Sequence, residues 1–512
     1  MNRRGFLRNS VVGSAITGGA ILSALSNPQE LHAQPTPTTS VPNLTHLTAE
    51  DHRLRLTNIA FCQKSIHGAM RTHLVTDYLP GQCNYNLGEY PCRKIWEIGE
   101  WDAAQLDRLK AEGIELIQLH EDWNDSQRLY GATKYSPLNP KGFRQFLDLA
   151  HQRGMKVIVY ASTGFIDRRD PDFREEWARD QDLVELFYKY ARCSPASPSW
   201  RAYIVNQLLR IMDEYGVDGL FNDMGYLPLA GNPAAPTKDE VLAFPETATH
   251  DGALGDLLAL IYDEVKRRGG IVKAHYGATD RPQTDLKVYD YIWVGETVDS
   301  IDSLREKVKN HPPYIVPCLD FSQVTIPNED EMYLQSIPYL QFPLLLAGKP
   351  VTGERAAIPG MHYANDGDDF WTKRLRNVWK YYQEHPEGPY NYGGWDSLPG
   401  RPAARKIHAD WLKLYAPMVE EGTWAWLQVS ETQLIHGRLP HGLAASVFAN
   451  REVYLVLANY GKTSVKIDTT QSYVSTRYPD QAANTHWELE PRSLLILKMR
   501  QLPTGNSSAP HF

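Results

Sequence analysis

Asp223 ends a short apolar stretch, residues 219–223, that follows a long amphipathic pattern at residues 200–215. Brief alternation of apolar residues predicts a strand, and Gly216 and Gly219 mark the turn before it. A carboxylate at the carboxyl end of a buried barrel strand lies on the face where barrel enzymes carry their sites. The plainer alternative is structural, because an Asp after a strand also caps the following helix.

Polar side chains follow other apolar runs in the same way. We expect them to meet at one mouth, because the carboxyl ends of barrel strands share a face. They are His120, Glu121, Asp122, Trp123, Tyr160, Asn222, Asp223, His275, Glu296 and Asp320. Two carboxylates beside aromatic rings suit hydrolysis of a glycosidic bond, in which one acid protonates the leaving oxygen and the other attacks the anomeric carbon or activates water.

The alternation of apolar runs and amphipathic segments predicts the fold that positions these residues. The expected strands are 58–61, 114–119, 156–160, 219–223, 271–274, 291–294, 314–319 and 342–346. The expected helices are 101–112, 143–153, 200–215, 254–268, 304–310 and 370–384. Such repeated units, without the Gly-rich turn of an open doubly wound sheet, favour an α/β fold of the closed (β/α)8 TIM-barrel type.

Beyond residue 420 the helical segments stop. Strand-like runs at 424–429, 434–439, 444–449, 453–459, 464–469 and 493–499 predict an appended antiparallel β-sandwich. The expected order is a signal peptide (1–33), a linker (34–50), a catalytic barrel (51–420), the β-sandwich (421–500) and a flexible tail (501–512). The long insert 63–98 is expected to form a lid or a subsite wall.

The N-terminal residues resemble a twin-arginine export signal. Arg3 and Arg4 precede an apolar run at 11–25, and residues 31–33 could end it as a signal-peptidase site. A membrane anchor is the less favoured alternative, because the run is shorter than the roughly 20 residues of a spanning helix. We expect a periplasmic or secreted protein with no stable membrane span after signal removal.

The composition is that of an ordinary globular protein. The chain has 512 residues, of which 42% are hydrophobic and 22% charged, and its net charge is -8. Because nucleic-acid binders cluster Lys and Arg, we expect no nucleic-acid partner. The 13 Trp and 28 Tyr suit stacking on sugars as well as core packing. The expected partner is an oligosaccharide or polysaccharide, and we predict no metal and no cofactor.

The five cysteines lack the spacing of a zinc site. Cys83 and Cys92 are close enough in sequence to be the favoured disulfide pair, and the other cysteines are expected to be buried thiols.

Residues 113–123, which read Gly-Ile-Glu-Leu-Ile-Gln-Leu-His-Glu-Asp-Trp, look like the second-strand motif of clan D glycoside hydrolases, the α-galactosidase group. Residues 140–143, 151–156 and 171–173 are similar to the helix, strand and loop that follow in that family. The resemblance spans residues 55–350. It implies retaining hydrolysis of an exo-linked α-glycoside.

By this resemblance, Asp223 corresponds to the family's nucleophile and Glu296 to its acid/base after the sixth strand. Three positions differ from the family pattern. Phe221 replaces a Lys, His120 replaces a sugar-binding Asp, and Glu296 replaces an Asp. These differences bear on the identity of the sugar more than on the reaction. Retention predicts carboxyl groups about 5 to 5.5 Å apart.

We assign sugar contacts to a further set of strand-end residues, with a structural polar cluster as the alternative. The set is His120, Asp122, Trp123, Asn222, His275 and Asp320. His275 shares one strand face with Lys273, and a buried hydrogen-bonded pair is as consistent with this spacing as a substrate contact. Asp218 begins its strand and is expected to be structural. Arg281 is a further candidate for the site.

Several alternatives stay open. The proton donor could instead be Asp299, Asp320 or Glu354, if the strand register differs from the predicted one. The barrel could be a non-catalytic carbohydrate-binding protein, since a fold does not fix a function. It could also be an endo-acting glycosidase or a transglycosidase.

Overall fold

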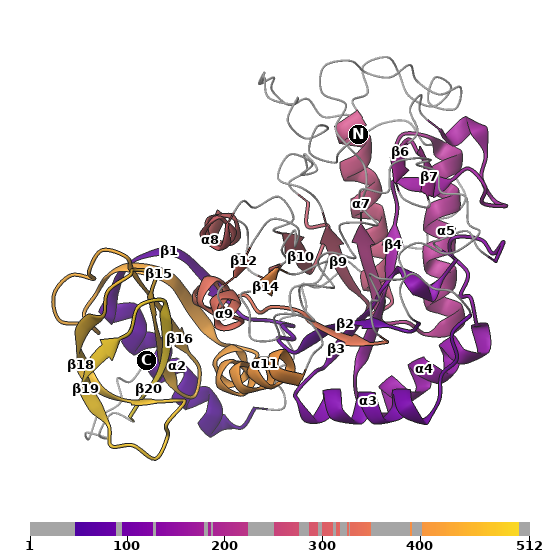
Figure 1. Cartoon of the computed structure of the whole chain (residues 1–512). Helices are drawn as coiled ribbons and strands as arrows, with labels where there is room; N and C mark the ends of the chain where they lie inside the picture. Colours follow the sequence, from indigo (N-terminus) through magenta and orange to yellow (C-terminus); the bar gives the residue numbers. More distant parts are fainter. Residues whose placement is uncertain are drawn as a thin grey trace.

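The computed structural model describes residues 47–88, 95–125, 130–178, 183–185, 188–223, 250–275, 286–294, 300–310, 314–317, 325–326, 328–349, 390–391 and 402–500. Figure 1 shows an α/β barrel beside a curved antiparallel sheet. The predicted signal peptide, the helix at 370–384 and the tail lie outside the described residues.

Eight parallel strands build the barrel, and the predicted fold class is confirmed. In chain order they are β2 (Gln82–Asn86), β3 (Leu116–Leu119), β4 (Lys156–Ser162), β8 (Gly219–Asp223), β9 (Ile271–His275), β10 (Tyr291–Val294), β11 (Ile315–Pro317) and β13 (Leu345–Gly348). Each pairs in parallel with its neighbour in sequence from β2 to β11, and β13 returns to pair with β2.

Helices lie around this sheet (Figure 1). They are α3 (Glu100–Ala111), α4 (Pro140–Gln152), α5 (Pro198–Tyr215), α7 (His250–Arg267), α8 (Ile301–Asn310), α9 (Asp330–Ser336) and α11 (Pro402–Tyr415). Helix α4 illustrates why they form: the Asn139 side chain accepts a hydrogen bond from Gly142 N at the first turn, and Phe143, Phe146 and Leu147 are buried in the core.

The predicted first strand is wrong, because residues 58–61 belong to helix α2 (Ala49–Ser65). A capping box between Thr48 and Asp51 starts this helix, which continues through the apolar residues. Ile59 and Cys62, three positions apart on one helix face, pack against the antiparallel sheet. The first barrel strand is β2 instead.

The insert 63–98 was expected to form a lid or a subsite wall, and most of its described part has other roles. Residues 66–74 form β1 (Ile66–Leu74) in the antiparallel sheet, and residues 82–86 form β2. The segment between them covers the end of the barrel where the strands begin. There Tyr291 Oη accepts a hydrogen bond from Leu79 N at 2.9 Å and donates to the Asp77 carbonyl at 2.9 Å.

The antiparallel β structure expected near the C-terminus is present as a sheet of seven strands. Its order is β1, β15 (Trp424–Thr432), β16 (Leu443–Ala449), β17 (Val453–Asn459), β20 (Ser493–Met499), β18 (Val465–Ser475) and β19 (Asn484–Leu489). Figure 1 shows the indigo α2 and β1 among the orange and yellow strands. The predicted strand 434–439 is only an isolated bridge from Ile435 to Thr469.

Both faces of β17 are covered, which explains its unbroken apolar sequence. Val453, Leu455 and Leu457 belong to the cluster between this sheet and α2, whereas Tyr454 and Val456 belong to the cluster of the barrel. Strands alternate their side chains between two faces, so an element buried on both sides needs apolar residues at every position.

The predicted disulfide is wrong for Cys83. This residue is a fully buried free thiol within β2, and burial raises its pKa to about 12. A side chain on the outward face of a barrel strand packs under the helices and is not presented to a loop cysteine.

Candidate active site at the carboxyl ends of the strands

Asp223 is the last residue of β8, and both of its carboxylate oxygens have donors. Tyr160 Oη donates to Oδ2 at 2.7 Å, and His275 Nδ1 lies 3.2 Å from Oδ1. A quarter of the Asp223 side chain is exposed, at 25%. Hydrogen bonds to both oxygens restrict the orientation of the carboxylate, and its exposure leaves it accessible to a ligand.

Strand pairing places these three residues together. Asp223 is opposite His275 on β9 and opposite Ser162 on β4, and Tyr160 lies two residues before Ser162. Gly219 permits this pairing at the start of β8, where its φ is 147° and a Cβ would lie 1.9 Å from the Ile271 carbonyl oxygen.

The arrangement extends across the mouth on both sides. The His120 and Tyr160 rings are 6.4 Å apart, and the His275 and Trp293 rings are 6.2 Å apart. His120, Tyr160, Asp223, His275 and Trp293 therefore form what we call the strand-end arc, which crosses β3, β4, β8, β9 and β10. The structure brings the predicted residues His120, Asp223 and His275 together there.

Trp123 and Asn222 support the arc from outside the barrel lumen. Trp123 has 0% exposure, stacks on Phe143 at 5.6 Å and donates from Nε1 to the Tyr160 carbonyl at 2.8 Å. Asn222 alternates with Asp223 and therefore faces outward, where its Oδ1 accepts a hydrogen bond from Thr163 Oγ1 at 2.7 Å.

Asp122 ties the first two strand ends together. Its Oδ2 accepts a hydrogen bond from Gly88 N at 2.6 Å, and its carbonyl accepts one from Trp96 Nε1 at 2.8 Å. The residue is 1% exposed, and burial raises the pKa of its carboxyl group well above the ordinary value. Its hydrogen bond with Gly88 N positions the loop after β2.

Lys273 lies one inward-facing position before His275 on β9 and is fully buried. Its Nζ donates to Gln82 Oε1 at 3.2 Å and lies 5.5 Å from the Trp293 ring centroid and 5.8 Å from that of Phe221. Register pairs Lys273 with Phe221. Strand β9 thus places the amine of Lys273 beside Phe221, the position on β8 where the resemblance would put a Lys.

Other predicted residues are elsewhere or undescribed. Asp218 is structural, as expected, since its Oδ2 accepts hydrogen bonds from Val157 N at 2.7 Å and from the His151 ring at 2.8 Å, at the opposite end of the barrel. Outside the described residues lie Arg281, Glu296, Asp299, Asp320 and Glu354.

Sequence reasoning missed two features beside the arc. A small sheet, of β5 (Phe165–Asp167), β7 (Tyr188–Arg192) and β6 (Leu183–Glu185), lies between β4 and α5. Lys134, in the segment before α4, extends its amine to the end of β4. Strands of three to five residues are too short to show a periodicity, and a lysine in a polar loop is usually solvated.

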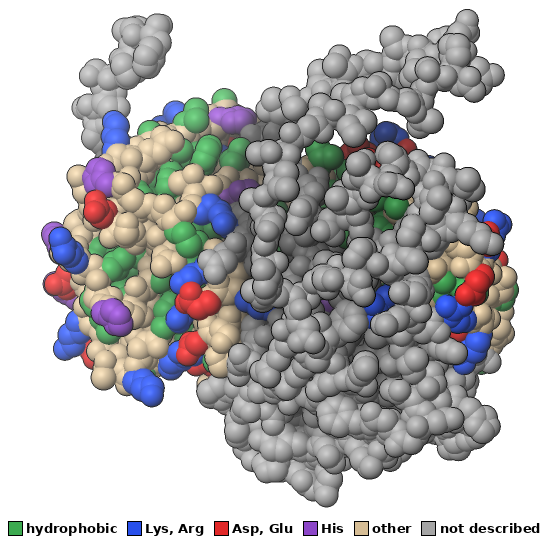
Figure 2. All heavy atoms as spheres, turned by 90° about the horizontal axis from the view of Figure 1, so that it is seen from above, with side chains coloured by type: hydrophobic (Ala, Val, Ile, Leu, Met, Phe, Trp, Pro, Cys, Tyr) green, Lys and Arg blue, Asp and Glu red, His purple; other side chains and the backbone are tan. Residues whose placement is uncertain are grey.

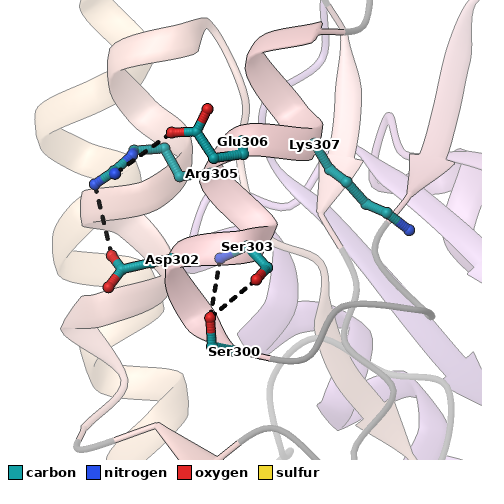
Figure 3. Close-up of a pocket in the computed structure, with 6 residues that line it drawn as sticks. All are labelled: Ser300, Asp302, Ser303, Arg305, Glu306 and Lys307. Atoms are coloured by element: carbon teal, nitrogen blue, oxygen red, sulfur yellow. Dashed lines mark hydrogen bonds and ion pairs between the residues drawn. The ribbon is translucent and has the colours of Figure 1, made fainter.

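A surface hollow of about 340 Å³ lies over α8 and is separate from the arc in composition (Figure 3). Its lining is Ser300, Asp302, Ser303, Arg305, Glu306 and Lys307. Asp302 and Glu306 both pair with Arg305 at 3.5 Å, and no strand-end residue contributes to the lining. The hollow offers paired surface charges in place of an aromatic-lined site.

Charged residues of both signs are interspersed on the described part of the face in Figure 2. Within the described ranges, no group of three or more His, Cys, Asp or Glu side chains could hold a metal ion. No helix in this part of the chain is both long and apolar enough to cross a bilayer.

No protein-family profile and no curated protein match the chain. Among solved structures, it is similar to a trehalulose synthase, at 12% identity and a TM-score of 0.51, over 82% of this chain and 99% of the other. It is similar to the α-glucosyl transfer enzyme XgtA at 13% identity and a TM-score of 0.50, over 83% and 100% of the two chains. Likenesses at this identity show the fold alone, a (β/α)8 barrel with a C-terminal β domain.

A GH36 α-galactosidase from Geobacillus stearothermophilus is also similar, at 10% identity and a TM-score of 0.44, over 88% of this chain and 59% of the other. This likeness is too weak to support the clan D relationship predicted from residues 113–123.

Proposed function

We propose that this protein is a retaining glycoside hydrolase that acts on α-linked glycosides, with Asp223 as nucleophile. The observation that carries the proposal is the position of Asp223 at the carboxyl end of a barrel strand, with both oxygens oriented by Tyr160 and His275. Similarity of the fold to enzymes named for α-glucosyl transfer and trehalulose synthesis supports the choice of an α-glycoside.

In the proposed reaction, Asp223 attacks the anomeric carbon and forms a glycosyl-enzyme, while an acid protonates the departing oxygen. Glu296, which follows β10 in the sequence, is our candidate for this acid and for the base that then activates water. His120 and His275 flank the nucleophile and are candidates for contacts with sugar hydroxyl groups. The roles of Asp122, Trp123 and Asn222 are then to hold the strand ends in place.

The test begins with nitrophenyl glycosides of both anomers and the Asp223→Ala variant. Turnover should fall by at least about 10⁴-fold, because the covalent route is lost. Added azide should restore turnover and give a glycosyl azide of inverted configuration, a result that a merely structural Asp cannot produce. Asp213→Asn, at a side chain that is 58% exposed, is the matched control and should behave as wild type.

Undiminished hydrolysis by Asp223→Ala would end the assignment. Sugar binding without hydrolysis of any glycoside by the wild-type protein would instead favour the non-catalytic carbohydrate-binding barrel. Preference for internal bonds of a polysaccharide would identify an endo-acting enzyme.

We also propose that residues 1–33 direct export by the twin-arginine route, to the periplasm or beyond. Replacing Arg3 and Arg4 by Lys should retain the protein in the cytoplasm, because this route reads the arginine pair. Cell fractionation with antibody detection measures this outcome, and unchanged export of the double variant contradicts it.

A further inference from the structure

Lys134 is hydrogen-bonded to β4, the strand that carries Tyr160. Its Nζ donates to the carbonyl oxygens of Ser162, the last residue of β4, and of Phe165, the first residue of β5. The neighbouring Tyr135 Oη donates to the same Ser162 carbonyl at 2.8 Å. Two consecutive side chains therefore converge on the carboxyl end of β4.

The backbone around Lys134 is held as firmly as its side chain. Lys134 N donates to Asp170 Oδ2 at 2.7 Å, and its carbonyl accepts a hydrogen bond from Asn124 Nδ2 at 2.5 Å. The residue thus joins three segments: the loop after β3, the end of β4 and the loop after β5. A side chain held at both its head and its backbone has few alternative rotamers to adopt.

The carboxyl end of β4 lies beside Asp223 in the sheet. Ser162 is opposite Asp223 in the register, and Thr163 N donates to the Asp223 carbonyl at 3.3 Å. A shift of Ser162 would displace Tyr160 as well, because the two residues belong to the same strand. The hydrogen bond from Tyr160 to Asp223 therefore depends on how the end of β4 is held.

The groups that influence the Lys134 amine electrostatically are largely acidic. Cys193, Asp170, Asp223 and Glu121 each raise its pKa, and burial opposes them more strongly, so that the pKa falls from 10.5 to about 8. These groups come from four different parts of the chain. The amine of this half-buried residue is thus a cation whose electrostatic surroundings include Asp223 and Glu121, two of the strand-end acids.

We propose that Lys134 is a positioning residue of the candidate site, which fixes the end of β4 beside Asp223 and balances the negative charge of Asp223. This inference rests on the proposed function for its catalytic consequence. Its structural part, the coupling of Lys134 to Asp223, stands independently of any reaction.

The catalytic consequence is tested by pH profiles of kcat/KM for wild type and Lys134→Met. Because the amine loses its charge above its pKa, wild-type activity should decline as the pH rises past about 8. Lys134→Met should be roughly 10-fold less active at pH 7 and should lack this decline. Lys156→Met is the matched control, since Lys156 begins the same strand and is exposed, and it should keep the wild-type profile.

Lys134→Arg keeps the positive charge but removes the titration of the amine. A guanidinium stays protonated throughout this range, so the decline past pH 8 should disappear while activity is retained better than in Lys134→Met. A wild-type decline that persists in both variants overturns the proposal. This second variant also decides the matter if Lys134→Met fails to fold.

The structural part is tested without substrate by a double-mutant cycle on the unfolding midpoint, with Lys134→Met, which removes the charge, Asp223→Asn and the double variant. Sites that are energetically coupled give non-additive shifts, and independent sites give additive ones. Additive shifts overturn the coupling. Non-additive shifts in a protein that hydrolyses no glycoside would reject the proposed function and retain the positioning of Asp223 by Lys134.

Discussion

Two donors from neighbouring strands hold the carboxylate of Asp223, and they differ in kind. Tyr160 supplies a hydroxyl group at 2.7 Å, whereas His275 supplies an imidazole, a group that can exchange a proton with solvent or substrate. We therefore expect Tyr160 to act by orientation alone. Its contribution can be separated from that of the lysine that holds its strand.

Tyr160→Phe should lower kcat/KM by roughly 10- to 100-fold, because a hydrogen bond to a charged group contributes about 1.5–3 kcal/mol. Steady-state kinetics on the best nitrophenyl glycoside measure the effect. Tyr262→Phe is the matched control, since Tyr262 donates at 3.0 Å to Asp290, the residue that precedes β10 at the other end of the barrel. Equal kcat/KM values for the two variants would contradict the assigned role.

The sequence predicted Asp223 and His275 because alternation along a strand fixes which residues share a face. The sequence alone did not show which of the adjacent residues Asp223 and Asn222 faces the lumen. The strand register shows that it is Asp223. The position of Lys134 beside the site could not be predicted from the sequence, for another reason. Its contacts to Ser162 and Phe165 depend on the path of a loop, which leaves no periodic pattern.

Among the strands and helices, the elements from β3 to β10 followed the predicted order, because these strands are local apolar runs and α4, α5 and α7 between them carry amphipathic patterns. The first strand was wrong because the capping box at Thr48 makes a helix of a run that is apolar enough for a strand. Strand β19 was missed because exposed and half-buried positions alternate along it, with few large apolar residues to mark it.

Segment 75–81 shows why the predicted lid was misplaced. Three of its hydrogen bonds join it to Tyr291 and Tyr314, the residues that open β10 and precede β11, and hence to the end of the barrel opposite Asp223. The ring of Tyr78 stacks on Tyr314 at 4.7 Å. Sequence gives the length of such a segment and not the end of the barrel that it covers.

The barrel and the antiparallel sheet share buried structure, and the chain crosses between them twice. Strand β1 pairs with β15 although 350 or more positions separate the paired residues, a pairing that no local pattern predicts. Ser446 Oγ donates to the Pro338 carbonyl at 2.6 Å, and Tyr460 Oη donates to the Leu334 carbonyl at 3.1 Å. We therefore expect the two parts to unfold together.

Arg492 provides the charged link in this shared structure. Its guanidinium binds Glu331 through two hydrogen bonds, of 2.9 and 2.6 Å, and Asp302 through a third of 2.9 Å. The Glu331 side chain is only 4% exposed, so removal of its partner leaves a buried charge without compensation. A bidentate pair of this kind differs from a surface ion pair, which typically contributes about 0–1 kcal/mol.

Arg492→Met should lower the free energy of unfolding by about 3–5 kcal/mol, and the double variant Arg492→Met with Glu331→Met should recover much of that loss, because no buried charge is then left unpaired. Denaturant unfolding followed separately by tryptophan fluorescence and far-ultraviolet circular dichroism measures both the size and the coincidence of the transitions. Arg451→Met is the matched control, since Arg451 is 48% exposed where it meets Glu420. A loss in Arg492→Met that is no larger than in this control would show that the contact does not stabilise the protein. Separate transitions in the wild-type protein would show that the sheet and the barrel do not unfold together.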